Sequence, residues 1–265
     1  MKLLPLLAAA IFGIGAAPAS AHTPYLAPSD FAPRAGQTIA LDAAFAETFF
    51  VPEVAFDHSL LTITRPDGSS TAPDTVQVMK TRTVAEYTLP AGSGSYRLST
   101  GPRLGAVFRT WEIDGRRESS HDPATPIPAG AKVIANFQAL TLAETYVSVG
   151  APDRTALAAR DKGLEFVPVT HPNDLYVGEH FEFLVKYDGA PLAAQKVEIT
   201  EAVWTSDRTP RTQILTTDAN GRVRLTLDRA GTFIALSRYR TPAPATAPVA
   251  EYSHSYTLTF RVLKP

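Results

Sequence analysis

Histidine is the residue type on which chemistry in this chain would depend. The sequence contains six histidines and no cysteine, and Met79 is the only methionine after Met1. Disulfides, thiolate metal sites, iron–sulfur clusters and cysteine nucleophiles are therefore excluded, and so is a thioether-rich copper(I) store. Any transition metal would be bound by imidazole, amine, carboxylate or water.

His22 is the first candidate ligand because of what precedes it. Lys2 and the apolar run Leu3 to Ala17 are followed by Ala19-Ser20-Ala21, the small-residue pattern of a signal-peptidase site. We expect residues 1–21 to be a signal peptide and the mature protein to be exported to the periplasm. Cleavage after Ala21 would give His22 a free α-amine beside its imidazole, and these two nitrogens can chelate one transition-metal ion. The alternative is that His22 is merely the residue after the cleavage site.

His58 and His171 are the further candidate ligands. Asp57 directly precedes His58, and a carboxylate that orients an imidazole is common around metal sites, although adjacent strand residues face opposite sides. His171 opens the loop His171-Pro172-Asn173-Asp174, where it could equally serve as a turn residue. The remaining histidines fit bland roles: a solvated strand face for His180, a turn for His121, and a strand entrance near the core for His254.

Several classes of function find no support. The chain lacks a G-x-S-x-G elbow, a phosphate-binding loop, an H-E-x-x-H motif and a dinucleotide fingerprint, so we expect no enzyme and name no catalytic residues. Acidic pairs such as Glu112 and Asp114 are more simply solvated charges. The net charge is −1 and basic residues form no long run, so we expect no nucleic-acid partner.

The pattern of the mature chain is that of an all-β protein. The full sequence contains 22 prolines and 16 glycines, and after residue 21 these residues separate short segments of alternating hydrophobicity. In the segment Phe181 to Tyr187, Phe181, Phe183 and Val185 share one face, and Asp218-Ala-Asn-Gly221 is a hairpin-type turn. We expect two β-sandwich domains, 22–155 and 163–265, the second immunoglobulin-like or transthyretin-like. No segment after residue 21 is long and apolar enough for a transmembrane helix.

Several ordered motifs resemble one bacterial family over nearly the whole mature chain. They include His22-Thr-Pro-Tyr-Leu-Ala-Pro-Ser29, Phe56-Asp57-His58, Pro66-Asp67-Gly68, Leu164-Glu-Phe-Val-Pro-Val-Thr-His-Pro-Asn-Asp-Leu175, Asp188-Gly-Ala-Pro191 and Thr217-Asp-Ala-Asn-Gly221. The family is domain-of-unknown-function family 4198, formerly filed as NikM-like nickel-uptake components. This sequence departs from the family pattern in two segments. The segment Phe49 to Ala55, which leads to the Asp57-His58 pair, is longer, and the segment Thr241 to Val249 is rich in proline.

The resemblance implies a periplasmic protein of two β-rich domains, often associated with TonB-dependent metal acquisition. The histidine that opens the mature family members corresponds to His22. The family's F-D-H corresponds to Asp57 and His58, and its P-V-T-H-P-N-D-L to His171.

Two main hypotheses follow. In the first, the protein binds a transition-metal ion (copper, nickel, cobalt, iron or zinc) through His22, with His58 and His171 as further ligands. Asp57 would not bind the ion but would orient a ligand imidazole. It would then receive or deliver the ion, with an inner- or outer-membrane transport component as a partner. In the second, it is a non-catalytic interaction module of an envelope assembly. A third, an N-terminal-histidine copper oxygenase, needs an aromatic substrate surface. If His22 and His58 do not come within metal-ligand reach of each other in the fold, the first hypothesis loses its main support.

Overall fold

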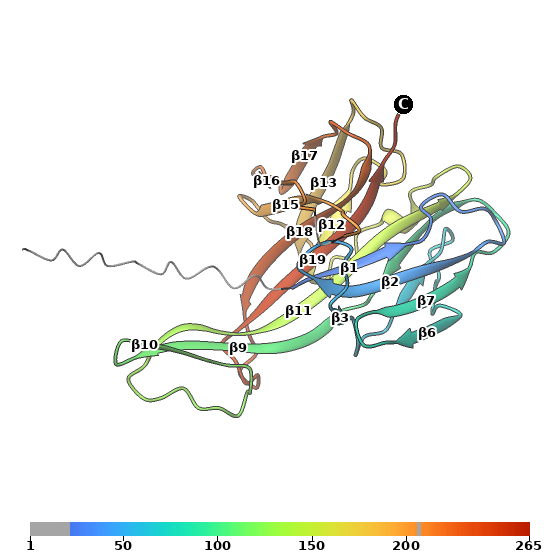
Figure 1. The fold of residues 1–265 in the computed structure, drawn as a ribbon. Helices are drawn as coiled ribbons and strands as arrows, with labels where there is room; N and C mark the ends of the chain where they lie inside the picture. Colours follow the sequence, from blue (N-terminus) through green and yellow to red (C-terminus); the bar gives the residue numbers. More distant parts are fainter. Residues whose placement is uncertain (1–21, 206–207) are drawn as a thin grey trace, which may run out of the picture.

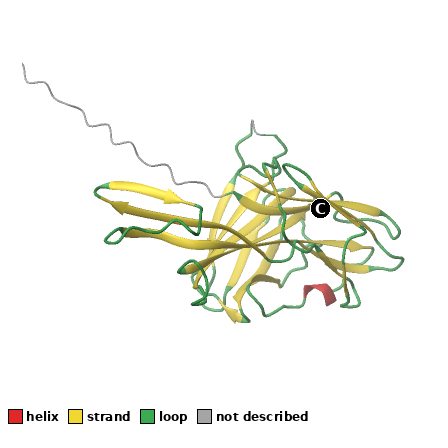
Figure 2. Ribbon diagram, turned by 90° about the horizontal axis from the view of Figure 1, so that it is seen from below, coloured by secondary structure: helices red, strands yellow, loops and turns green. Residues whose placement is uncertain are grey.

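The described residues form three β-sheets and one turn of 3-10 helix (Figures 1 and 2). The computed structural model describes residues 22–205 and 208–265, so the expected signal peptide lies outside the described residues. Within the described ranges no helix is long and apolar enough to cross a membrane.

The first sheet has five strands in the order β1-β2-β7-β6, with β3 paired to β2. Its strands are β1 (Thr23–Pro28), β2 (Thr38–Ala46), β3 (Val54–Ala55), β6 (Thr75–Val78) and β7 (Thr83–Thr88).

The second sheet has ten strands and runs through both halves of the chain, with the path β16-β15-β18-β19-β11-β8-β4-β5. Strands β9 and β10 extend it from β11. Its strands are β4 (Thr62–Thr64), β5 (Ser70–Thr71), β8 (Gly94–Ser99), β9 (Arg103–Ile113), β10 (Arg116–Ser120), β11 (Lys132–Val149), β15 (Lys196–Glu201), β16 (Thr212–Thr216), β18 (Gly231–Pro242) and β19 (Glu251–Val262).

The third sheet has four strands and covers the second half of the ten-stranded sheet. Its strands are β12 (Leu164–Pro168), β13 (His180–Tyr187), β14 (Ala190–Pro191) and β17 (Arg222–Thr226), and the helical turn η1 spans Thr155–Leu157. In β13 the side chains of Phe181, Phe183 and Val185 are fully buried, as the alternating pattern predicts. The expected all-β class is confirmed, with two β-sandwiches of which the second is immunoglobulin-like.

Strand β11 is the wall that the two sandwich cores share. Ala143 and Val147 face the first core, whereas Leu142 and Tyr146 face the second. Both faces of this part of β11 are therefore covered, and its residues 141–149 are all buried. The sequence predicts two strands here, Lys132 to Leu140 and Glu144 to Val149. The structure corrects this to one strand of 18 residues, because burial on both faces removes the alternation on which a strand assignment depends.

The two halves of the chain are joined by a parallel strand pair. Strand β11 from the first half pairs with β19, the last strand of the chain, from Phe137↔Glu251 to Thr145↔Thr259. The boundary expected between residues 155 and 163 falls at η1 and the turn that follows it. The cores are separate, but the ten-stranded sheet is continuous, and the division into two folding domains stays a prediction.

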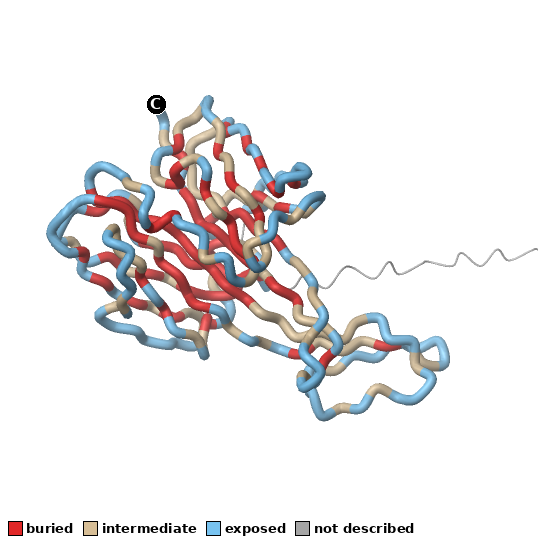
Figure 3. The backbone as a smooth tube through the Cα atoms, turned by 180° about the vertical axis from the view of Figure 1, so that it is seen from behind, coloured by how far each residue is buried: buried red, intermediate tan, exposed pale blue. Residues whose placement is uncertain are grey.

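A three-stranded arm projects from the body of the molecule (Figures 1 and 3). It consists of β9, β10 and the first part of β11. Several of its apolar side chains are exposed, among them Leu104, Val133 and Ile134. Figure 3 shows that the arm carries little buried chain compared with the two sandwiches.

Candidate functional site

His22 lies at the start of the described chain, immediately before β1, and its side chain contacts Glu53. Its Nε2 is 2.8 Å from Oε2 of Glu53. Strand β2 brings these residues together because β1 and β3 flank it on opposite sides. Thr23 pairs with Ala46, and Glu53 donates its backbone N–H to the carbonyl of Phe45. Both side chains therefore reach across the same end of β2.

The contact defines which ring nitrogen of His22 remains free. A carboxylate only accepts hydrogen bonds, so Nε2 of His22 carries the proton and donates it to Glu53. The other carboxylate oxygen of Glu53 accepts the backbone N–H of Glu47 at 2.9 Å, which fixes the carboxylate in place. In the neutral ring, Nδ1 of His22 is then the nitrogen that keeps its lone pair. This is the arrangement in which metal-binding histidines commonly occur.

The segment that carries Glu53 is anchored by long-range contacts. Phe49 and Phe50 are buried and both pack on the ring of Tyr25 in β1. Phe50 donates its backbone N–H to the carbonyl of Val203, and Val203 donates its own to the carbonyl of Phe49. Beside them, the indole of Trp204 contacts the ring of Phe50 in a tilted arrangement with the ring centroids 4.9 Å apart, and Trp204 is 67% exposed. The segment from Phe49 to Ala55, which is longer than in the family pattern, thus positions Glu53 next to His22.

Asp57 and His58 lie elsewhere and have their own partners. The Nε2 of His58 is 3.4 Å from Oδ2 of Asp57, and the His58 side chain is 83% exposed. The second oxygen of Asp57 forms an ion pair of 2.6 Å with Arg103, which stacks over the ring of Phe45. Asp57 therefore does contact His58, but its main role is to hold the side chain of Arg103, the first residue of β9, against the first sheet.

The register keeps His58 away from His22. Thr23 pairs with Ala46, whereas Phe56 donates its N–H to the carbonyl of Ala43. His22 and Phe56 are thus about four positions apart along β2, or roughly 13 Å. A shared ion needs ligand distances of about 2.0–2.2 Å to nitrogen and oxygen. The two histidines, each in a segment that flanks the first sheet, lie too far apart for one ion, so the metal hypothesis loses the support that their convergence would have given. His58 as a ligand stays a prediction.

His171 is buried and its ring nitrogens are both engaged. Its Nδ1 accepts the backbone N–H of Asn173 at 3.1 Å, and its Nε2 donates to the carbonyl of Asp153 at 2.9 Å. Ser95 Oγ lies 2.9 Å from the same Nε2. Burial lowers the pKa of the ring, which favours its neutral form. This geometry argues against the expected ligand role and makes His171 a link between β8 and the residues that follow β11.

No described cluster of three or more histidine, aspartate or glutamate side chains has the geometry to hold a metal ion. Glu53 is the residue that sequence reasoning missed. No local motif marks it, because it is 31 residues from His22 and reaches it only through the pairing of three strands.

Comparison with known proteins identifies the family of the chain. The family model "Domain of unknown function (DUF4198)" matches residues 19–241, so the chain belongs to this family, as its motifs indicated. No curated protein matches the sequence.

Three solved structures match the chain over most of its length at low sequence identity. The D0-D1 domain of intimin is 12% identical, with coverage of 89% of this chain and 96% of that chain and a TM-score of 0.21. The Yersinia pseudotuberculosis adhesin InvE is 14% identical, with coverage of 90% and 58% and a TM-score of 0.23. The three N-terminal domains of the bacteriophage RB49 outer capsid protein Hoc are 10% identical, with coverage of 92% and 100% and a TM-score of 0.24. At such scores these similarities carry no argument about function.

Proposed function

We propose that the mature protein binds a transition-metal ion in the periplasm through the α-amine and Nδ1 of His22, and that it supports metal uptake or homeostasis. The observation that carries the proposal is the 2.8 Å contact between Nε2 of His22 and Glu53. It holds the ring in the tautomer that leaves Nδ1 free, and cleavage after Ala21 would supply the amine beside it.

The chemistry of this donor pair defines the kind of site. The chelate would be formed by the α-amine and Nδ1 of His22, and Pro24, two residues further on, has no backbone N–H that a metal could replace. Amine and imidazole nitrogens suit copper, nickel, cobalt, iron or zinc. The side chains of His22 and Glu53 are 43% and 38% exposed, so the remaining coordination positions would be open to water. An open site suits receipt and delivery of an ion better than a closed structural site does.

The role in transport goes beyond the site itself. It rests on the association of the family with TonB-dependent metal acquisition that the resemblance implies. The partner would be an inner- or outer-membrane transport component that takes the ion from the exposed side of His22. In this proposal His58 is a ligand only of a second, independent weak site.

The test is isothermal titration of the mature protein, with its N-terminus confirmed by mass as His22, against copper(II), nickel(II), cobalt(II), iron(II) and zinc(II). A matched form carries one extra alanine before His22 and keeps the imidazole but moves the amine. Tight binding of one ion per chain that is lost in the extended form supports the proposal. Binding that is equal in the two forms, or no stronger than that of an exposed histidine such as His58, overturns it.

The second candidate is a non-catalytic interaction module of an envelope assembly. The projecting arm favours it, because Leu104, Val133 and Ile134 are exposed on an element that contributes little to either core. Failure of the titration would leave this candidate as the better account of the chain. Removal of the apolar side chains of the arm, as in Val133→Thr with Ile134→Thr, would then be expected to abolish a co-purifying partner without lowering stability.

A further inference from the structure

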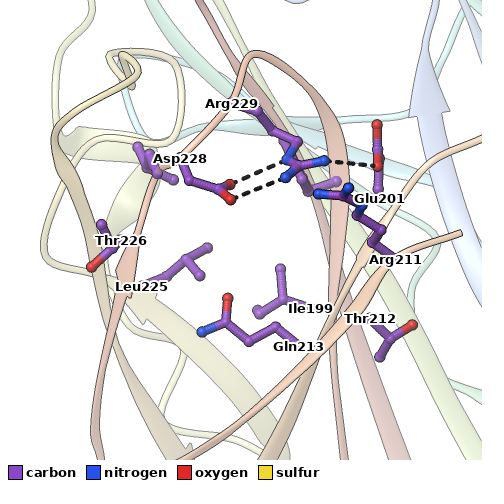
Figure 4. A pocket seen from close by; sticks show the side chains of 11 residues that line it. Ile199, Glu201, Arg211, Thr212, Gln213, Leu225, Thr226, Asp228 and Arg229 are labelled. Atoms are coloured by element: carbon purple, nitrogen blue, oxygen red, sulfur yellow. Dashed lines mark hydrogen bonds and ion pairs between the residues drawn. The ribbon is translucent and has the colours of Figure 1, made fainter.

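A pocket lies at the open side of the second sandwich, and neither His22 nor Glu53 is among the residues that line it. It has a volume of about 220 Å³ and lies between β15, β16 and β17 (Figure 4). Strand β16 pairs only with β15, and β17 pairs only with β13, so each is an edge strand of its sheet. The pocket opens between these two edges because no described strand closes the sandwich there.

The floor of the pocket is apolar and belongs to the second core. Its side chains are Ile199, Leu225, Leu227 and Phe233, of which the first three are nearly fully buried. Thr226 and Gln213 line the rim. An apolar floor with a few polar groups at the mouth is the usual composition of a small-molecule site. The volume is below the ~300–1,000 Å³ of sites for drug-sized ligands, so it fits a small molecule.

The charges at the mouth are unequally partnered. The guanidinium of Arg229 binds Asp228 at 3.1 Å and lies 3.8 Å from the carboxylate of Glu201. Both acidic side chains of the lining are therefore already engaged by one arginine. Arg211 also lines the pocket, and it forms no direct ion pair with a carboxylate of the described residues, although its charge acts on Asp228. Figure 4 shows its side chain and that of Arg229 pointing toward one another above the floor.

Within the described residues, Arg211 is thus an exposed guanidinium without a direct carboxylate contact, beside an apolar cavity. Guanidinium binds a carboxylate through two parallel hydrogen bonds, which fixes the orientation of the ligand. We propose that this pocket binds a small aliphatic carboxylic acid, with its hydrocarbon body on Leu225 and Phe233 and its carboxylate on Arg211. The site shares no residue with the metal site proposed at His22, and each can exist without the other.

The test uses 4-methylpentanoate as the probe and 4-methylpentanamide as its uncharged analogue. Backbone amide shifts in ¹⁵N-labelled mature protein are followed during titration of each compound. The proposal expects saturable shifts confined to β15, β16 and β17 with the acid, and affinity weaker by about tenfold or more with the amide. The Arg211→Gln variant is expected to lose the same factor for the acid and to leave the amide unaffected.

Arg224→Gln is the matched control, because Arg224 is on the outer face of β17 and pairs with Glu182. It should bind the acid as the parent protein does. Both arginines are exposed, so neither variant is expected to disturb folding, which far-UV circular dichroism checks. No saturation in the millimolar range, shifts located elsewhere, or equal affinity of the parent and Arg211→Gln proteins would each overturn the proposal. Loss of copper binding at His22 would leave it intact, because the two sites are tested with different probes.

Discussion

The carboxylate of Glu53 and the imidazole of His22 meet at 2.8 Å although 31 residues separate them. Strand β2 lies between the segments that carry them, and the hydrogen bond from the Glu47 backbone holds the carboxylate. The result is an imidazole whose orientation is set before any ion arrives. Such preorganisation raises metal affinity, because the ring need not be ordered on binding.

Replacement of Glu53 tests this positioning role. We expect Glu53→Ala to weaken copper(II) binding by about 10–100-fold, since loss of the outer partner frees the ring and its tautomer. Glu53→Gln should lose less, because the amide oxygen still accepts the Nε2 proton. Isothermal titration of the mature forms measures both.

Glu47→Gln is the control for the charge change near the site, since the side chain of Glu47 is exposed and only its backbone contacts Glu53. It should bind copper(II) as the parent protein does. If all three variants bind equally, Glu53 does not position the ligand, and the proposed role of this carboxylate is wrong.

Local patterns in the sequence predict the alternating strands and the tight turns of the fold. Features that depend on pairing between distant residues leave no such pattern. The alternation in β13 and the turn at Asp218 to Gly221 are local signals, and the structure contains both. Strand β1 was not predicted, because Pro24 and Pro28 lie within it. They are tolerated because β1 is an edge strand of the first sheet. Glu53 was missed for a related reason, since its importance comes from the register of β1, β2 and β3.

A buried ion cluster joins the two halves of the chain. Arg160, which follows η1, lies 3.2 Å from the carboxylate of Glu144 in β11 and 3.6 Å from that of Glu165 in β12. Both glutamates are 2% exposed, and Tyr256 in β19 donates its hydroxyl to Glu144 at 2.6 Å. No spacing in the sequence predicts this cluster, because its members come from separate elements.

We expect Arg160→Met to lower the free energy of unfolding by about 3–5 kcal/mol, because two carboxylates would remain buried without their cation. Urea denaturation at neutral pH measures the change. Arg224 pairs with Glu182 through a side chain that is 59% exposed, so Arg224→Met should cost only about 0–1 kcal/mol. A loss for Arg160→Met as small as that for Arg224→Met would show that the cluster does not stabilise the junction.

The buried ring of His171 predicts a pH dependence of stability. Burial lowers its pKa below the usual value near 6.5, so the unfolded chain takes up a proton that the folded chain resists. Stability is therefore complete above the unfolded pKa and falls as the pH drops below it, by at most about 1.4 kcal/mol per pH unit for this group. His171→Gln, whose amide can still donate to the carbonyl of Asp153, should show a smaller loss between about pH 7.5 and pH 5.5. Burial shifts the pKa of His254 in the same direction, so part of the loss should persist. Equal slopes for parent and variant in urea unfolding would contradict this assignment.

Gly221 ends the turn that precedes β17, and its backbone leaves no room for a side chain. Its φ is +72°, and a Cβ there would lie 2.7 Å from the carbonyl oxygen of Val185. Gly115, in the turn between β9 and β10, has nearly the same φ of +71° but no atom within 4 Å of such a Cβ. We expect Gly115→Ala to cost about 1–2 kcal/mol from the left-handed backbone alone. Gly221→Ala should cost more, because the added methyl group would also clash with the carbonyl of Val185. That carbonyl cannot move away without disturbing β13. Urea unfolding of the two variants separates the two causes, and equal costs would mean that the turn at Gly221 relaxes freely around the added methyl group.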